Sequence, residues 1–151
     1  MEIGKNRTGI VLAITVLWVL ITICGWTGRW FEGLLMGVLL MLLHMMMGAA
    51  QNGKLDRKLF MYPLLTWFVV WIAGFFFSKY YSDLFLNMAP TFKILGFHPS
   101  FAAIILAYWI GGVLTLTLGL VKFDALWLSD ENWDAFKRKM DQLNQKEGAH
   151  E

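Results

Sequence analysis

The sequence predicts an all-α integral membrane protein with four transmembrane helices and a helical cytosolic tail. Hydrophobic residues fill 58% of the 151 positions and charged residues only 16%, which leaves too little polar surface for a soluble domain of this size. The apolar residues gather in four stretches of 18 to 21 residues, 9–26, 31–50, 60–77 and 101–121. At about 1.5 Å per residue, each stretch can cross a hydrocarbon core of roughly 30 Å.

Each stretch is expected to be helical, because a backbone amide inside lipid must be hydrogen-bonded within its own segment. The connection 27–30 is so short that the first two helices should form an antiparallel hairpin. Pro63 is expected in the first turn of the third helix, where its missing N–H has no cost. The connection 78–100 is longer and rich in aromatic residues.

The basic residues predict the orientation. If both termini are cytoplasmic, ten of the 13 Lys and Arg lie inside, and only Arg29, Lys79 and Lys93 lie outside. This distribution satisfies the positive-inside rule. Four spans also require both termini on one side, so the two observations agree on cytoplasmic N and C termini.

The chain divides into a four-span bundle, 1–121, and a cytosolic tail, 122–151. Ser129, Asp130 and Glu131 offer an N-cap and an acidic first turn for a helix over about 129–145. One face of this helix is apolar and is formed by Trp133, Phe136, Met140 and Leu143. The face is expected either to lie on lipid headgroups or to dock on the cytosolic surface of a partner.

Two spans carry stripes of small residues. In the fourth span a small side chain recurs at every fourth position, at Ala103, Ala107, Gly111, Thr115 and Gly119. A shorter stripe, Gly33 and Gly37, opens the second span. Small residues let two helix backbones approach closely inside a membrane. The stripes predict close helix packing, either within this chain or with another subunit.

His44 is the one strongly ionisable side chain inside the spans, since Glu32 lies at the outer boundary near Arg29. The imidazole is expected to be neutral and hydrogen-bonded to a neighbouring helix. The alternative is a haem or quinone site that another chain completes. His98 cannot join His44 on one iron, because it lies at the outer end of the fourth span and His44 lies nearer the cytoplasmic side.

Several function classes are disfavoured. The sequence has no nucleophile paired with a base, no Gly-rich phosphate loop and no zinc motif, so neither an enzyme activity nor a resident cofactor is expected. Nucleic-acid binding is also disfavoured, because a net charge of +2 does not provide the extended basic surface that such binding uses. Cys24 is the single cysteine, which excludes an intrachain disulfide.

Several short motifs lie within residues 57–127, namely Arg57-Lys58-Leu59-Phe60, Tyr62-Pro63-Leu64, Gly96-Phe97, Pro99 and Phe123-Asp124. With these motifs, this half of the chain resembles a family of small bacterial membrane proteins that accompany acetate-type sodium:solute symporters. The resemblance implies a multi-pass protein of the bacterial inner membrane. It also implies a many-span symporter as partner, which would hold the ligands for sodium and for a small organic solute.

The favoured hypothesis is therefore a non-catalytic accessory subunit of a membrane transport complex, in contact with a larger multi-span protein and with the lipid bilayer. The alternative is the membrane-anchor subunit of a redox complex, with His44 near a haem or quinone site. A third hypothesis is a homo-oligomer that builds a transport pathway lined by His44.

Overall fold

The computed structural model describes residues 2–147, and within that range the chain is helical without a strand. Four helices are long and apolar enough to cross a membrane: Gly4–Trp26, Trp30–Gly48, Arg57–Leu84 and Pro99–Lys122. The four expected apolar helices are thus confirmed by length and composition. Residues 148–151 of the expected tail lie outside the described residues.

Several of these helices are built from shorter segments. The first joins η1 (Gly4–Asn6) to α1 (Arg7–Trp26), and the second is α2 (Trp30–Gly48). The third joins α3 (Arg57–Leu59), η2 (Phe60–Leu65) and α4 (Thr66–Leu84). The fourth joins α5 (Pro99–Ile105), η3 (Leu106–Gly111), η4 (Val113–Thr117) and α6 (Leu118–Lys122). The short α7 (Asp124–Trp127) and α8 (Asp130–Glu147) follow.

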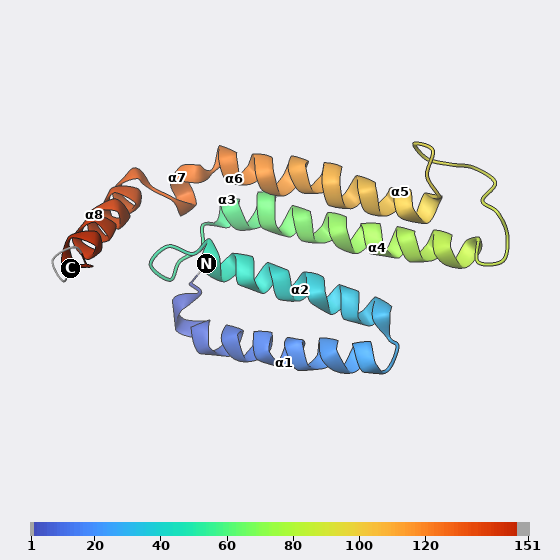
Figure 1. Cartoon of the computed structure of the whole chain (residues 1–151), viewed down its shortest axis with the longest axis horizontal. Coiled ribbons are helices and arrows are strands. Elements are labelled where there is room, and N and C mark those ends of the chain that lie inside the picture. The colour runs from blue at the N-terminus through green and yellow to red at the C-terminus, as the bar shows by residue number, and fades with distance from the viewer. Residues whose placement is uncertain (1, 148–151) are drawn as a thin grey trace.

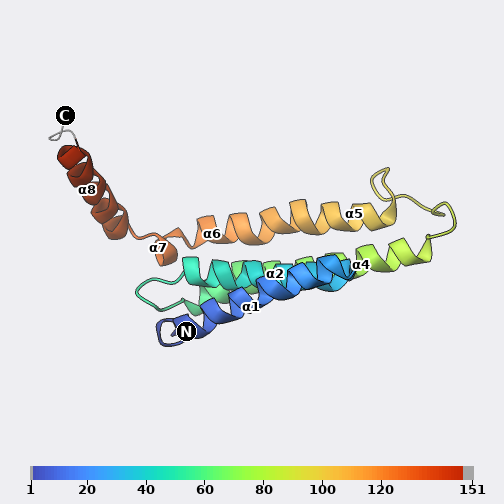
Figure 2. The same ribbon diagram turned by 60° about the horizontal axis from the view of Figure 1, so that its bottom comes forward.

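The helices lie side by side in an open row rather than in a closed four-helix bundle (Figure 1). The order across the row is α1, α2, α4 and the fourth helix, and α1 packs mainly on α2. The third helix is central, with 33% of its most apolar window buried, against 6% for the first helix. Figure 2 shows that α8 extends away from the row. Apart from the sides that contact α2 and the third helix, α1 and the fourth helix therefore remain largely uncovered by this chain.

The third helix is longer than the expected range 60–77. It begins earlier because the Asp56 carboxylate caps its N-terminus and accepts a hydrogen bond from the Lys58 N–H at 2.7 Å. It continues to Leu84, and the Lys79–Asp83 ion pair at 2.9 Å, one turn apart, supports the added turns. The long connection is consequently shorter than the sequence predicted.

Pro63 lies inside the third helix and not in its first turn, which corrects the sequence-based expectation. The helix around Pro63 takes a π-helical form over Phe60–Leu65, because proline lacks the N–H that an α-helical ladder needs. The Thr66 hydroxyl donates to the Met61 carbonyl at 3.1 Å in the same stretch. The fourth helix contains two further π-helical segments, η3 and η4.

The third and fourth helices are also joined by a hydrogen bond at the π-helical segments. The Tyr62 hydroxyl donates to the Leu114 carbonyl at 2.9 Å, across the helix pair. Within the fourth helix, the Thr115 hydroxyl donates to the Gly111 carbonyl at 2.7 Å. Side-chain hydroxyls thus hydrogen-bond to backbone carbonyls in the π-helical segments. Backbone polar groups at membrane depth need such partners, because lipid supplies none.

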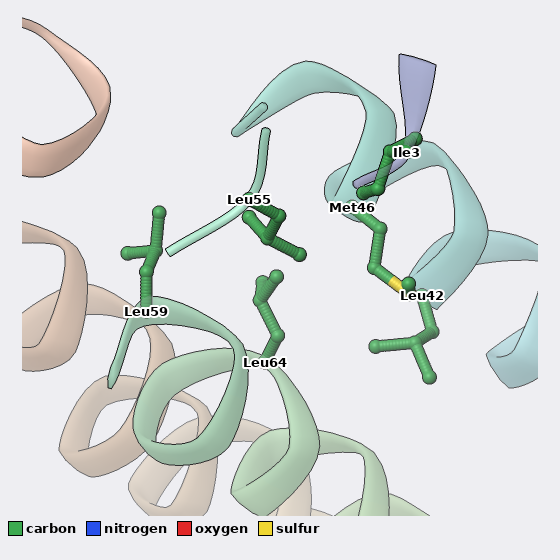
Figure 3. Close-up of a cluster of buried hydrophobic side chains, with 6 residues drawn as sticks. All are labelled: Ile3, Leu42, Met46, Leu55, Leu59 and Leu64. Atoms are coloured by element: carbon green, nitrogen blue, oxygen red, sulfur yellow. The ribbon is translucent and has the colours of Figure 1, made fainter. Parts of the chain in front are cut away.

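One end of the row, the basic end, carries four basic residues, Lys54, Arg57, Lys58 and Lys122. A buried apolar cluster closes this end (Figure 3), and it consists of Ile3, Leu42, Met46, Leu55, Leu59 and Leu64. The N-terminal segment contributes to it because the N–H groups of Ile3 and Gly4 both donate to the Gly53 carbonyl at 2.8 Å. The loop after α2 is therefore held by the first residues of the chain.

Candidate functional site

The small-residue stripe of the fourth helix faces the third helix of the same chain. A Cβ at Gly111 would lie 2.6 Å from Val70 Cγ1, and one at Gly119 would lie 2.6 Å from Pro63 Cβ. Ala107 Cβ occupies the space that a Cβ at Gly74 would need. These helices are in contact because no larger side chain separates them. The stripe is therefore used within the chain.

The other two members of that stripe have local roles beside the same contact. Ala103 places its carbonyl oxygen 3.6 Å from the Cβ position of Gly74. Thr115 is 7% exposed, and its hydroxyl is satisfied by the Gly111 carbonyl one turn earlier. By contrast, nothing lies within 4 Å of a Cβ built on Gly112, the next residue along the chain.

Of the Gly33 and Gly37 stripe, Gly33 faces α1 and Gly37 faces open space in this chain. A Cβ at Gly37 would have no neighbour within 4 Å, and one at Gly33 would meet only Cys24 Cβ, at 3.5 Å. Both glycines line an apolar groove of about 710 Å³, together with Gly25 near the end of α1. The groove walls come from all four spanning helices and include Trp18, Leu34, Trp71, Phe75 and Tyr108. The second span thus presents a glycine-lined surface to which another helix or a lipid chain could bind closely.

An aromatic stack forms one wall of this groove. The Trp71 and Tyr108 rings stack with centroids 3.8 Å apart, and the Trp67 ring lies 4.6 Å from the Trp71 ring. Trp71 is only 7% exposed, and its indole N–H has no hydrogen-bond partner among the described residues. Sequence reasoning missed this stack, because the two rings meet only through the packing of α4 against η3.

His44 is exposed on the side of α2. Its Nδ1 atom lies 2.8 Å from the Leu40 carbonyl oxygen, one turn earlier in the same helix. The imidazole therefore bonds within its own helix, and the expected bond to a neighbouring helix is not found among the described residues. With Nδ1–H as the donor, Nε2 is left as an acceptor. The described residues contain no group of three or more His, Cys, Asp or Glu side chains placed to hold a metal ion.

The predicted apolar face of the tail is present on α8. Its four side chains are between 39% and 52% exposed, and they are Trp133, Phe136, Met140 and Leu143. The Trp133 and Phe136 rings lie nearly parallel, with centroids 5.6 Å apart. On the flank of this face, Lys137 Nζ lies 2.8 Å from the Asp134 carboxylate. Hydrogen bonding to Lys137 lowers the pKa of Asp134 below its usual range.

The end of the row opposite the basic end has its own charge cluster. Arg29 Nη2 lies 2.9 Å from Glu32 Oε1, so the pairing expected from the sequence is present. Hydrogen bonding to Glu32 raises the pKa of Arg29. Lys79 Nζ lies 5.8 Å and 5.7 Å from the ring centroids of Trp30 and Phe31. The contacts of Lys79 with the two rings join the start of α2 to α4.

Comparison of the chain with protein-family models, with curated proteins and with solved structures finds no match.

Proposed function

We propose that this chain is a non-catalytic accessory subunit of a membrane transport complex in a bacterial inner membrane. In this proposal its termini are cytoplasmic and its partner is a larger multi-span protein, namely a sodium symporter for a small organic solute. The observation that carries the proposal is the groove over Gly33 and Gly37, which is lined for close helix contact and left open by this chain. The resemblance of residues 57–127 supports the choice of a symporter.

The charge distribution supports a partner-dependent role. Apart from Glu32 at the outer boundary, the apolar stretches 9–26, 31–50, 60–77 and 101–121 hold one imidazole, His44, and no carboxylate, lysine or arginine. Transport pathways for ions and charged solutes are usually lined by such groups or by broken helices. The ligands for the ion and the solute then belong to the larger chain.

The test is co-purification of the tagged full-length chain from its native membrane in mild detergent, with mass spectrometry of the recovered chains. A Gly37→Val substitution adds an isopropyl group to the groove floor, where the chain itself has open space. We expect the large partner to be recovered with the natural chain and lost with G37V. Gly112→Val is the matched control, because it also projects into open space but does not line this groove.

Recovery of the natural chain as a stable monomer without a large partner would overturn the proposal. Equal loss of the partner with G37V and with G112V would overturn the assignment of the groove. Thermal unfolding of both variants checks that the chain itself is intact.

A second candidate function rests on the geometry of His44. A backbone carbonyl on Nδ1 with Nε2 left free is the arrangement in which histidine binds metals and haem iron. In that case the chain anchors a redox complex, and a haem ligand or a quinone comes from another subunit. The visible spectrum of the purified complex separates the two functions. A Soret band that disappears in His44→Leu supports the haem version, and its absence from the natural complex excludes that version.

A further inference from the structure

The apolar face of α8 has the spacing of a coiled-coil seam. Trp133, Phe136, Met140 and Leu143 are separated by three, four and three residues, which corresponds to positions a, d, a and d of two heptads. All four side chains are about half exposed, and α8 extends away from the row of spanning helices. The seam is therefore complete and uncovered within the described part of the chain.

The composition of α8 argues against a membrane surface as the occupant of this seam. A helix that lies among headgroups usually has a wide apolar face and an excess of Lys and Arg on its polar face. Residues 130–147 hold five acidic and four basic side chains, so they carry no net attraction for anionic lipid. The apolar positions are confined to a and d, which suits the narrow seam between two helices.

The charges beside the seam are compatible with a second copy of α8 in parallel orientation. In a parallel pair each g position lies beside the e position five residues later on the partner helix. Here those pairs are Asn132 with Lys137 and Lys139 with Asn144. Each pair joins one lysine to one neutral amide, so no like charges meet.

The antiparallel arrangement is less favourable for the same residues. With the two seams fully overlapped, e positions face e positions and g positions face g positions, and the central residue of each kind lies beside its own copy. Lys137 would then lie beside Lys137 of the other copy, and Lys139 beside Lys139. Repulsion between these lysines disfavours the antiparallel orientation.

We propose that α8 joins two copies of this chain through a parallel pairing of the Trp133–Phe136–Met140–Leu143 seam. A membrane supports this orientation, because all copies insert the same way and their tails leave on the same side. Two heptads are too short to pair stably in free solution, but the tether to the membrane raises the effective concentration of one tail beside another. This inference does not depend on which larger chain occupies the glycine groove.

Disulfide trapping in the full-length protein tests the proposal. In a Cys24→Ser background, single cysteines are placed at Phe136 or Leu143, both d positions, and at Arg138, on the opposite side of α8. The protein is oxidised in its native membrane, and the linked fraction is measured on a non-reducing gel. We expect Phe136→Cys and Leu143→Cys to give several-fold more linked dimer than Arg138→Cys. The two d positions are tested in separate variants, so that each variant retains the other three seam residues.

Three results would overturn the pairing. Equal linkage at all three positions would mean random collision, and no linkage at Phe136 or Leu143 would mean that the seam meets something else. A mixture of Phe136→Cys and Met140→Cys chains that forms linked heterodimers, while neither variant links to itself, would establish the antiparallel orientation instead.

Discussion

At the scale of single residues, glycines decide which close approaches this chain makes. Gly53 combines two demands, because its φ of 76° is in the left-handed region and its Cβ position lies 3.0 Å from Gly4 Cα. Its carbonyl accepts the N–H groups of Ile3 and Gly4. This one residue therefore holds the N-terminal segment against the loop after α2.

We expect Gly53→Ala to lower the free energy of unfolding by about 1–2 kcal/mol from the positive φ alone, with a further loss from contact with Gly4. Gly28→Ala is the control, because Gly28 has a φ of 72° but no atom within 4 Å of its Cβ position. Thermal unfolding in detergent measures both variants. Equal destabilisation by the two substitutions would show that the contact with Gly4 has no energetic weight.

At the scale of elements, the small-residue stripe joins the third and fourth helices. Gly111 faces Val70, and Gly112, its neighbour, faces open space. Gly111→Val should therefore destabilise the chain by about 1–3 kcal/mol through overpacking. Gly112→Val adds the same side chain and also removes a glycine from the fourth helix, but it should leave this helix pair intact. Unfolding followed by tryptophan fluorescence distinguishes them, and equal effects would contradict the packing of the stripe.

The Asp134–Lys137 pair predicts how α8 responds to acid. The pKa of the Asp134 carboxyl is lower in the folded helix than in the unfolded chain. The pair therefore stabilises α8 above the ordinary carboxyl range and ceases to do so as the pH falls through the folded pKa. Hydrogen exchange of α8 amides in the full-length chain should accelerate at acidic pH relative to the intrinsic rate. Asp134→Asn should remove part of that dependence, and an unchanged pH profile would contradict the role of the pair.

At the scale of the whole molecule, the four spanning helices form an open row. The third helix contacts α2 on one side and the fourth helix on the other, and α1 lies at the edge. Only Ile14 is buried within α1. A four-span protein arranged in this way has lateral surface available for a partner, and the glycine groove is part of that surface.

The proposed orientation is tested by labelling in a Cys24→Ser background. Lys54 lies at the basic end, and Asn87 lies in the loop at the opposite end. With cytoplasmic termini, a membrane-impermeant maleimide should label Asn87→Cys in spheroplasts, whereas Lys54→Cys should react only after lysis. The reverse pattern would invert the topology, and labelling of both in intact spheroplasts would exclude a cytoplasmic location for the loop after α2.

Local chemistry determined much of the fold in advance. Hydropathy alone located the four spanning helices, because lipid requires each segment to satisfy its own backbone. The capping residues and the apolar periodicity located α8, whose observed range Asp130–Glu147 is close to the expected 129–145. The third helix was placed too narrowly, since Asp56 and the Lys79–Asp83 pair extend it into polar sequence.

The sequence by itself determined that two stripes of small residues exist, and only the tertiary structure decided their use. The fourth-helix stripe packs on Val70 and Pro63, whereas in the second helix Gly33 faces Cys24 and Gly37 remains open. That His44 bonds to Leu40 of its own helix, and not to a neighbouring helix, was decided in the same way. Both outcomes depend on which helices become neighbours and at what rotation, which is a property of the assembled row. Hydropathy and spacing are properties of one helix, and they carry no information on its neighbours.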